Sequence, residues 1–316
     1  MTIRRFNLEE DLQRLEEYLR EEYLVNRNMT SWLPGRLNDL IWRMDVQYAD
    51  AGQLRSSDFI YMWEDEGKIA GCILPDGDAV YISLNRDHED LYGQMVSFAE
   101  ENLIPLFSRD EDGSVDFLVI NNDSLPSRKA YLEANGYSRQ KEEDYDNYVY
   151  PQKIDVSVNL PLGFRLAYGD EYTDEDNKWS ACNMGFHPDL ESPVYRNGMS
   201  AYNSRKNSPL YKDSFECMII DENPEDPNDV CSYSFVYVDL LSKTAYIEPV
   251  STRERYRHKG IGTAMMHGVM RRCRELGVEK CYVNSYDWRR KFYNAAGFTT
   301  EDTIGFYHKS LRLNNH

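Results

Sequence analysis

The residues best suited to chemistry form one short basic stretch, RHKGIG, at residues 257–262. It follows a strand-like run, AYIEPV, and precedes an amphipathic run at residues 261–276 that is typical of a helix. The first N–H groups of a helix have no intrahelical partner, and the helix dipole is positive there, so glycines at that point let a phosphate approach the backbone. The stretch therefore predicts an anion-binding site.

The charge around this stretch is the reverse of that of the whole chain. Residues 253–274 contain seven Lys or Arg and one acidic residue, Glu254, whereas the formal net charge of the complete sequence is -18. The spacing is neither the GxGxxG dinucleotide fingerprint nor a P-loop, because no Lys-Ser or Lys-Thr pair follows the second glycine. Taken alone, the pattern is also compatible with a solvated basic face on a helix that begins with glycines.

Composition indicates two globular domains. The chain has 316 residues, of which 41% are hydrophobic and 28% charged, which is enough for two packed cores. No run of eighteen apolar residues occurs, and the N-terminal segment is polar and acidic from its start. We therefore expect no membrane span and no secretory signal, and a cytoplasmic protein.

The charge and cysteine content narrow the possible partners. With 54 acidic and 36 basic residues, the chain lacks the net positive charge by which proteins neutralise phosphates, so nucleic acid is not an expected partner. The acidic excess would attract a cationic ligand, or would serve solubility alone. The six cysteines form no CxxC pair and the six histidines have no ligand spacing, so we expect reduced thiols and no metal site.

The expected elements occur twice in the same order. In the first half we expect strands at 2–6, 59–67, 68–77, 79–85, 115–121 and 144–151. We expect helices at 8–26, 36–48 and 90–106, and a fourth helix that ends at residue 137. In the second half we expect strands at 162–169, 215–222, 230–238, 244–250, 280–286 and in a C-terminal tail, and helices at 174–184, 195–205, 261–276 and 287–298. Arg4 and Arg165 lie 161 residues apart, as do Gly136 and Gly297, which indicates a duplication rather than two unrelated domains.

These patterns predict an α/β protein with a mixed sheet, of the α+β kind. We expect two tandem domains, residues 1–150 and 151–316, each a mixed, mostly antiparallel sheet flanked by helices. The boundary would lie in the polar, proline-bearing stretch of residues 150–162.

With its flanks, the basic stretch resembles a known family. The segment YIEPVSTRERYRHKGIGTAMMHGVMRRCRELG, followed by RRKFYNAAGF, is similar to the strand, pyrophosphate loop and cofactor-side helix of the GNAT superfamily of acetyl-CoA-dependent N-acetyltransferases. The resemblance is direct over residues 162–311 and is one of topology only in the first half. It implies that acetyl-CoA is the cosubstrate.

The resemblance implies which residues hold coenzyme A. The pyrophosphate would lie on the backbone from His258 to Thr263, with charge added by Arg257 and Lys259, and the pantetheine arm would run along the strand end from Val250 to Thr252. The implied cofactor-binding residues are Val250, Ser251, Thr252, Arg257, His258, Lys259, Gly260, Ile261, Gly262 and Thr263. Pro249 fits an interrupted strand pairing, because proline donates no ladder hydrogen bond, although it also fits an ordinary strand end.

The resemblance also implies catalytic roles. Glu248 would take the amine proton, directly or through water, and a backbone N–H near Val250 would bind the thioester oxygen. Tyr293, four residues before Gly-Phe, would protonate the departing thiolate. The alternatives are a solvent-facing strand glutamate and an amphipathic core tyrosine.

Three further residues are candidate cofactor contacts that match the family pattern less closely. Arg289 and Arg290 share a helical face with Tyr293 and are expected to reach the cofactor phosphates. The family often has an Asn about seven residues before the Tyr, where this chain has Tyr286 or Asp287, so Asn284 is the available substitute.

The first half lacks the same features. Tyr81 and Gly93 are twelve residues apart, against sixteen for Tyr246 and Gly262, so the phosphate loop is shortened, and Leu132 stands in the place of Tyr293. We expect a degenerate domain that does not bind coenzyme A but can cover the acceptor cleft and supply side chains to it. Trp32 and Trp42 are expected to be buried helix aromatics.

The function expected is transfer of an acetyl group to a primary amine of a small, cationic acceptor, such as an amino sugar, a polyamine or an aminoglycoside. The alternatives are a non-catalytic acyl-CoA sensor or interaction module, and an acetyltransferase that acts on a protein amine. We expect a monomer or a homodimer.

Overall fold

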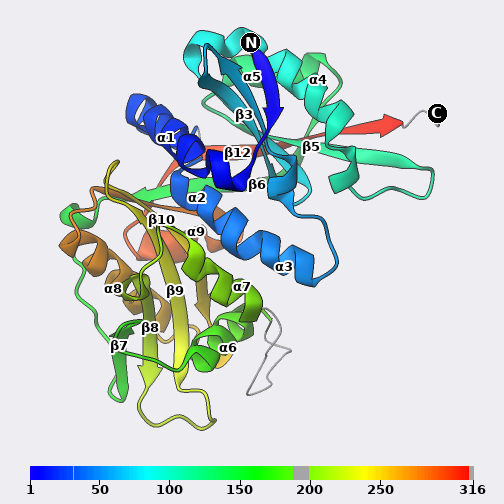
Figure 1. Ribbon diagram of the computed structural model, residues 1–316. Coiled ribbons are helices and arrows are strands. Elements are labelled where there is room, and N and C mark those ends of the chain that lie inside the picture. The colour runs from blue at the N-terminus through cyan, green and yellow to red at the C-terminus, as the bar shows by residue number, and fades with distance from the viewer. Residues whose placement is uncertain (31, 188–198, 313–316) are drawn as a thin grey trace.

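The computed structural model describes residues 1–30, 32–187 and 199–312 (Figure 1). In the first half the strands are β1 (Thr2–Arg5), β2 (Tyr61–Asp65), β3 (Lys68–Asp76), β4 (Ala79–Leu84), β5 (Ser114–Asn122) and β6 (Ser138–Val149), and the helices are α1 (Leu8–Asn26), α2 (Pro34–Asp39), α3 (Asp45–Asp50), α4 (Tyr92–Asn102) and α5 (Pro126–Ala134). In the second half the strands are β7 (Phe164–Tyr168), β8 (Glu216–Asp221), β9 (Val230–Asp239), β10 (Thr244–Thr252), β11 (Lys280–Tyr286) and β12 (Thr299–Arg312), and the helices are α6 (Glu175–Phe186), α7 (Met199–Ser204), α8 (Ile261–Glu275) and α9 (Arg290–Ala295).

The second half repeats the order of elements of the first, as the sequence predicts. Each half contains one parallel strand pair, β4 with β5 and β10 with β11, and each of these pairs extends over only three residues of either strand. The other pairings among the described strands are antiparallel. The prediction of a mixed, mostly antiparallel sheet flanked by helices is confirmed.

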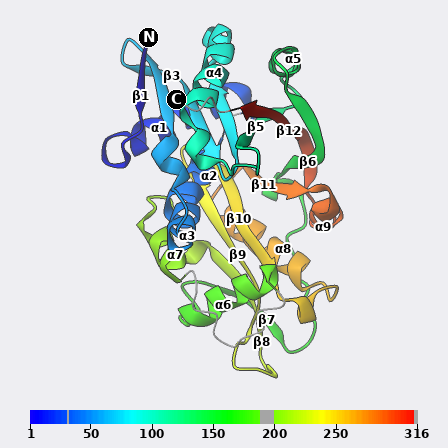
Figure 2. The ribbon, with the colours of Figure 1, turned by 90° about the vertical axis from the view of Figure 1, so that its right-hand side faces the viewer.

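The two halves share one twelve-stranded sheet, because each gives its last strand to the junction. The strand order is β1-β2-β3-β4-β5-β12-β6-β11-β10-β9-β8-β7. The last strand of the chain, β12, therefore pairs with β5 of the first half, and β6 pairs with β11 of the second half. Figure 2 shows β12 beside β5 at the top of the molecule and β6 leading toward β11. The sheet is continuous across the boundary predicted near residue 150.

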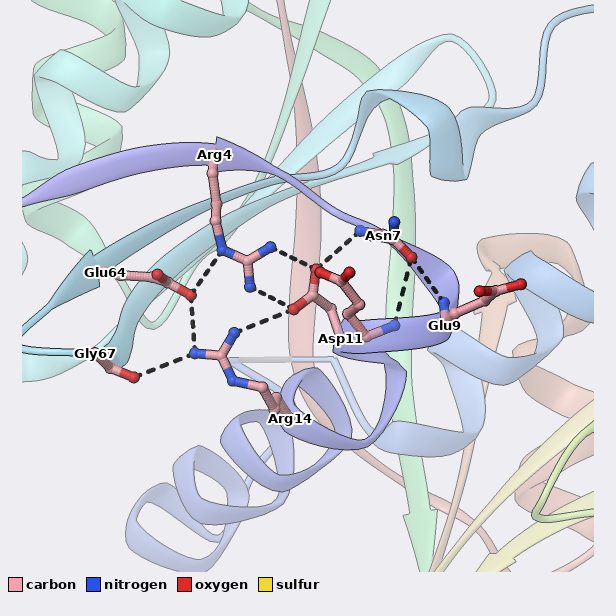
Figure 3. A network of polar contacts seen from close by, with 8 residues as sticks. Arg4, Asn7, Glu9, Asp11, Arg14, Glu64 and Gly67 are labelled. Carbon is pink, nitrogen blue, oxygen red and sulfur yellow. Dashed lines mark hydrogen bonds and ion pairs between the residues drawn. The ribbon is translucent and has the colours of Figure 1, made fainter.

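The first helix is fixed to the first two strands by an ion network (Figure 3). The side chain of Asn7 caps α1 by accepting from backbone N–H groups in its first turn. Glu64 on β2 accepts from Arg4 at 3.1 Å and from Arg14 at 2.8 Å. Both arginines also donate to Asp11, which is fully buried. The four opposite charges satisfy one another and hold α1 against the edge of the sheet.

The helical segment after α1 joins the first half to the second. It runs through α2, a π-helical turn at Leu40–Met44 and α3, so the helix expected at 36–48 is longer by a few residues and contains one wider turn. A Cβ on Gly35 would lie 2.8 Å from the Cβ of Tyr237 and 2.9 Å from that of Tyr246. Only glycine allows α2 to pack so closely on β9 and β10.

The six cysteines are buried, and none is joined to another. Burial raises the pKa of the Cys182 thiol to about 12, so this side chain stays protonated and acts as a small core residue. In the ranges given above, no helix is long and apolar enough to cross a membrane. Within the same ranges, no group of three His, Cys, Asp or Glu side chains is placed to hold a metal ion.

Candidate active site

The helical segment of residues 34–44 faces the sheet of the second half (Figure 1). A cavity of about 540 Å³ lies between them. Its lining from the first half consists of Trp32, Arg36, Asp39, Leu40, Arg43, Met44, Asp76 and Asp144. Its lining from the second half consists of Phe186, Tyr246, Glu248, Val250, Asn284, Ser285, Tyr286, Trp288, Arg289 and Tyr293. The volume is within the range of small-molecule sites.

The floor of the cavity is one face of three neighbouring strands. Side chains alternate between faces along a strand, so Tyr246 and Glu248 of β10 point to the same side. In the antiparallel pairing of β11 with β6, Tyr286 lies opposite Asp144, and Asn284 lies opposite Asp146. The last strand of the first half thus supplies a carboxylate to the site of the second half.

The strands β10 and β11 separate at this floor. Their parallel pairing ends at Tyr246 with Tyr282, although both strands continue. On its other side, β10 shifts register against β9 between Ile247 and Val250, at the position of Pro249. The backbone of β10 beyond Tyr246 therefore has no ladder partner on the β11 side, which is the interruption expected from the proline.

The glycine stretch forms the N-terminus of α8. Gly260 has a φ of 80° and His258 a φ of 61°, and the helix begins at Ile261 without a side-chain cap. The first hydrogen bond of the helix is from the N–H of Ala264 to the carbonyl of Gly260 at 2.9 Å. The N–H groups of Ile261, Gly262 and Thr263 precede it, so they have no intrahelical acceptor and are available to an anion.

The side chains of this loop divide into two kinds. Arg257 donates to the carbonyls of Thr252, at 3.1 Å, and Gly185, at 2.6 Å, so its hydrogen bonds hold the loop together. His258 and Lys259 are exposed beside Gly260. The guanidinium of Arg257 is thus already used within the protein, whereas Lys259 is exposed beside the start of α8.

Two other predicted positions are also used within the protein. Ser251 is buried and donates to the carbonyl of Cys182 at 2.7 Å, and Thr252 shares a hydrogen bond with Ser232 at 2.8 Å. Their side chains shape the strand end, so a ligand there would meet backbone groups. Val250 lines the cavity directly.

Glu248 stands in the cavity beside a guanidinium from the first half. Its carboxylate lies 3.5 Å from Arg43, whose main partner is Asp39, at 2.5 Å. Removal from water raises the pKa of Glu248 to about 7, an effect that the nearby charge of Arg43 reduces. A carboxylate with this pKa is matched to proton transfer near neutral pH. Arg43 lies in the π-helical turn, and such turns are frequent at functional sites.

Tyr293 lies in the same cavity and is only 5% exposed. Burial and the charge of Glu248 both raise the pKa of its phenol, so the hydroxyl keeps its proton at neutral pH. A group that must donate a proton needs this state. The structure thus brings Glu248 and Tyr293 together, from β10 and α9.

The remaining predicted residues have separate outcomes. Arg289 lines the cavity and stacks on Trp288 at 4.2 Å, whereas Arg290 contacts Asp287 and the ring of Tyr145. Asn284 also lines the cavity, but its side chain accepts from Tyr246 at 3.0 Å and donates to Asp146. Asn284 therefore orders the cavity wall with hydrogen bonds that are already formed.

The first-half lining was not identified from the sequence. Trp32 was expected only as a buried helix aromatic, and it is 1% exposed, yet it also lines the cavity. The next helical turns carry Arg36, Asp39 and Arg43. No role was predicted for these three residues, because only the two tryptophans of this segment stand out in the sequence. Asp144 belongs to a tyrosine-rich extended run whose sequence did not predict a functional site.

The first half repeats the close packing of a helix-start glycine on an aromatic ring that the second half has at α8. Gly93, the second residue of α4, would place a Cβ 2.7 Å from Tyr131, as Gly262, the second residue of α8, would place one 3.1 Å from Phe292. Tyr131 and Phe292 are 161 residues apart, which supports the repeat. Leu132, in the place of Tyr293, is fully buried in the core.

An arginine occupies the gap between the first-half strands. Arg128, which precedes Arg289 by 161 residues, donates to the carbonyl of Ile82 on β4 at 2.8 Å. Its guanidinium also pairs with Glu89 at 2.5 Å, and its side chain is 5% exposed. The backbone acceptor next to the separated strands is therefore already bonded.

Several solved structures share the fold of this protein. A GCN5-related N-acetyltransferase from Sphaerobacter thermophilus has a TM-score of 0.58 and 14% identity, over 88% of this chain and 92% of that one. A GNAT-family acetyltransferase from Colwellia psychrerythraea has a TM-score of 0.57 and 10% identity, over 98% and 99%. A tandem GNAT protein from the clavulanic acid biosynthesis pathway has a TM-score of 0.54 and 14% identity, over 81% and 83%. At these identities the likeness establishes the fold, which is a tandem GNAT fold.

The family follows from the second half of the sequence. Residues 189–298 match the model of the acetyltransferase (GNAT) family, a range that includes β10, the α8 loop and α9. The second half therefore carries a domain of the acetyltransferase (GNAT) family. No curated protein matches the sequence.

Proposed function

We propose that the protein transfers the acetyl group of acetyl-CoA to a primary amine of a small, cationic acceptor. The observation that carries this proposal is the meeting of three features in one place. These are the free N–H groups at the start of α8, the separated strands β10 and β11, and Glu248 with Tyr293 in the cavity beside them. The free N–H groups would bind a phosphate, the separated strands would bind an extended thioester arm, and Glu248 and Tyr293 would exchange protons with the reacting groups.

The proposed reaction is direct attack of the amine on the thioester. Glu248, directly or through a water, takes a proton from the amine as its nitrogen bonds to the acetyl carbonyl carbon. A backbone N–H near Val250 donates to the carbonyl oxygen as charge develops on it. The carbon–sulfur bond then breaks, and Tyr293 gives its proton to the departing thiolate.

The enclosure of the cavity favours a small acceptor over a protein. Residues of the first half, from Trp32 to Met44, cover the face of β10 on which Glu248 lies. A peptide substrate would need an open groove along that face. The lining carries four carboxylates against three arginines, and this excess of negative charge favours a cationic acceptor.

A thiol-release assay with acetyl-CoA and a panel of small amines tests this function. We expect amines to accelerate thiol release well above hydrolysis and to yield the acetylated amine by mass spectrometry. If no amine does so while coenzyme A still binds, the protein is a sensor of acyl-CoA. If only peptides are acetylated, the acceptor class is wrong.

Replacement of Tyr293 by phenylalanine tests the proposed proton donor. Loss of the hydroxyl should lower kcat by about a hundredfold, because the thiolate then leaves without a proton. The affinity for coenzyme A should be unchanged by calorimetry. Tyr131→Phe, which removes a hydroxyl from the corresponding helix α5, serves as the control and should keep full activity. Equal kcat values for Tyr293→Phe and the wild type would remove Tyr293 from the mechanism.

A further inference from the structure

The carboxylates of the cavity differ in whether the protein already neutralises them. Asp76 pairs with Arg36 at 2.6 Å, and Asp39 pairs with Arg43 at 2.5 Å. Asp39 also accepts from the hydroxyl of Tyr237 at 3.0 Å. These two carboxylates are therefore satisfied within the protein and have little to offer an acceptor.

Asp144 is the exception. Its Oδ1 is enclosed and has no hydrogen-bond partner, and no ion pair with it occurs in the described part of the chain. Arg36 and Asp76 act on it only at longer range, with opposite effects, and the aromatic ring opposite it belongs to Tyr286. A carboxylate oxygen that is removed from water without a partner is costly, unless a ligand supplies one.

A second polar group on the same cavity also lacks a partner. Trp32 is 1% exposed, and its Nε1 donates to no atom of the residues that the structure describes. Its ring lies under the guanidinium of Arg36, with 4.5 Å between the centroid and the central carbon, so it is held rigidly in the wall. The wall made by Trp32 and Asp144 thus offers one donor and one charged acceptor, both unused.

We propose that Asp144 binds a second cationic group of the acceptor, so that the preferred substrates are amines with at least two positive charges. This inference rests on the proposed function. One amine would react beside Glu248, and a second ammonium group would pair with Asp144. The two carboxylates lie on β10 and β6, with β11 between them, and β10 has already separated from β11 at Glu248, so their backbones are more than two strand spacings, about 10 Å, apart. The acceptor must therefore be extended, as a polyamine or a diamino sugar is.

The test compares each diamine with the amino alcohol of the same length, in which a hydroxyl replaces one amino group. We expect the wild type to prefer the diamine in kcat/KM by roughly tenfold to a hundredfold, the range of a charge-assisted hydrogen bond. In Asp144→Asn this preference should disappear, because kcat/KM should fall much more for the diamine than for the amino alcohol. Glu142→Gln is the matched control, because it removes an exposed carboxylate from the same strand, and it should retain the preference.

The outcomes separate the subsite from the reaction. If Asp144→Asn keeps the preference, or loses activity equally with both acceptors, the subsite proposal is wrong and the acetyltransferase proposal stands. If no amine is acetylated, the acetyltransferase proposal fails, and calorimetry of diamine binding in the presence of coenzyme A decides the subsite. Diamine binding that is weaker in Asp144→Asn than in Glu142→Gln would support the subsite, and equal binding would overturn it.

Discussion

Replacing Glu248 with glutamine should lower kcat for amine acetylation by about a hundredfold to ten-thousandfold, because glutamine cannot accept the amine proton. The affinity for coenzyme A should be retained, since the side chain lies on the acceptor side of the opening between β10 and β11. Initial rates with a saturating amine, together with calorimetry of coenzyme A binding, measure the two effects separately.

The pH dependence gives this variant a second signature. The pKa of Glu248 is raised to about 7, so below that pH the carboxyl is protonated and cannot act as a base. In the wild type, kcat/KM should therefore show a rise with pH that is centred near 7. In Glu248→Gln this rise should vanish, whereas the ionisation of the amine substrate, which occurs at higher pH, should remain in both proteins.

The variant is needed because another carboxyl titrates in the same region. Burial raises the pKa of Asp146 to about 7 as well, and Asp146 accepts hydrogen bonds from Asn122, at 2.9 Å, and Asn284. A pH profile alone reports the coupled group and not one residue. If Glu248→Gln keeps both the rate and the rise near pH 7, the base lies elsewhere, and Asp146, acting through Asn284 and Tyr246, becomes the group to examine.

The local elements were predictable from the sequence, but their neighbours in the sheet were not. Amphipathic and alternating patterns placed the helix at residues 8–26 and most of the strands, because these patterns depend on neighbours in the chain. The exchange of β6 and β12 depends on which edge each strand meets, and strands as polar as β6 have no hydrophobic pattern that fixes a partner. The repeat could therefore be predicted, but the shared sheet could not.

The same distinction applies to the site. The α8 loop was predictable because its chemistry lies in backbone N–H groups and glycines that are consecutive in the sequence. The cavity wall was not, since Arg43 reaches Glu248 across 205 residues through the packing of α2 on β10. That packing depends on Gly35, which looks like an ordinary helix-start residue after Pro34. A contact between a helix and a strand that are far apart in the sequence leaves no periodic pattern in a single sequence.

Replacing Gly260 with aspartate should abolish coenzyme A binding. A carboxylate at that position would compete for the free N–H groups of α8 and would repel a pyrophosphate, so we expect the Kd to rise by about a hundredfold or more. Gly277→Asp is the matched control. Both glycines have positive φ values, 80° and 76°, and a Cβ on either meets nothing within 4 Å, so the backbone strain of the two variants should be similar. Both variants should remain folded at the assay temperature, while only Gly260→Asp should lose the ligand.

The stoichiometry of a calorimetric titration with coenzyme A tests whether the first half binds the cofactor. Arg128 occupies the gap between β4 and β5, and Leu132 replaces the tyrosine, so the wild type should bind one coenzyme A per chain and Gly260→Asp none. Two sites in the wild type, with one remaining in the variant, would mean that Arg128 can leave the carbonyl of Ile82 when a ligand arrives. The variant Arg128→Ala shows whether the first half fails to bind coenzyme A because Arg128 fills the gap between β4 and β5 or because its phosphate loop is shortened. If a second site opens in that variant, the arginine alone closes the first half, and if none opens, the shortened loop before Gly93 is sufficient to do so.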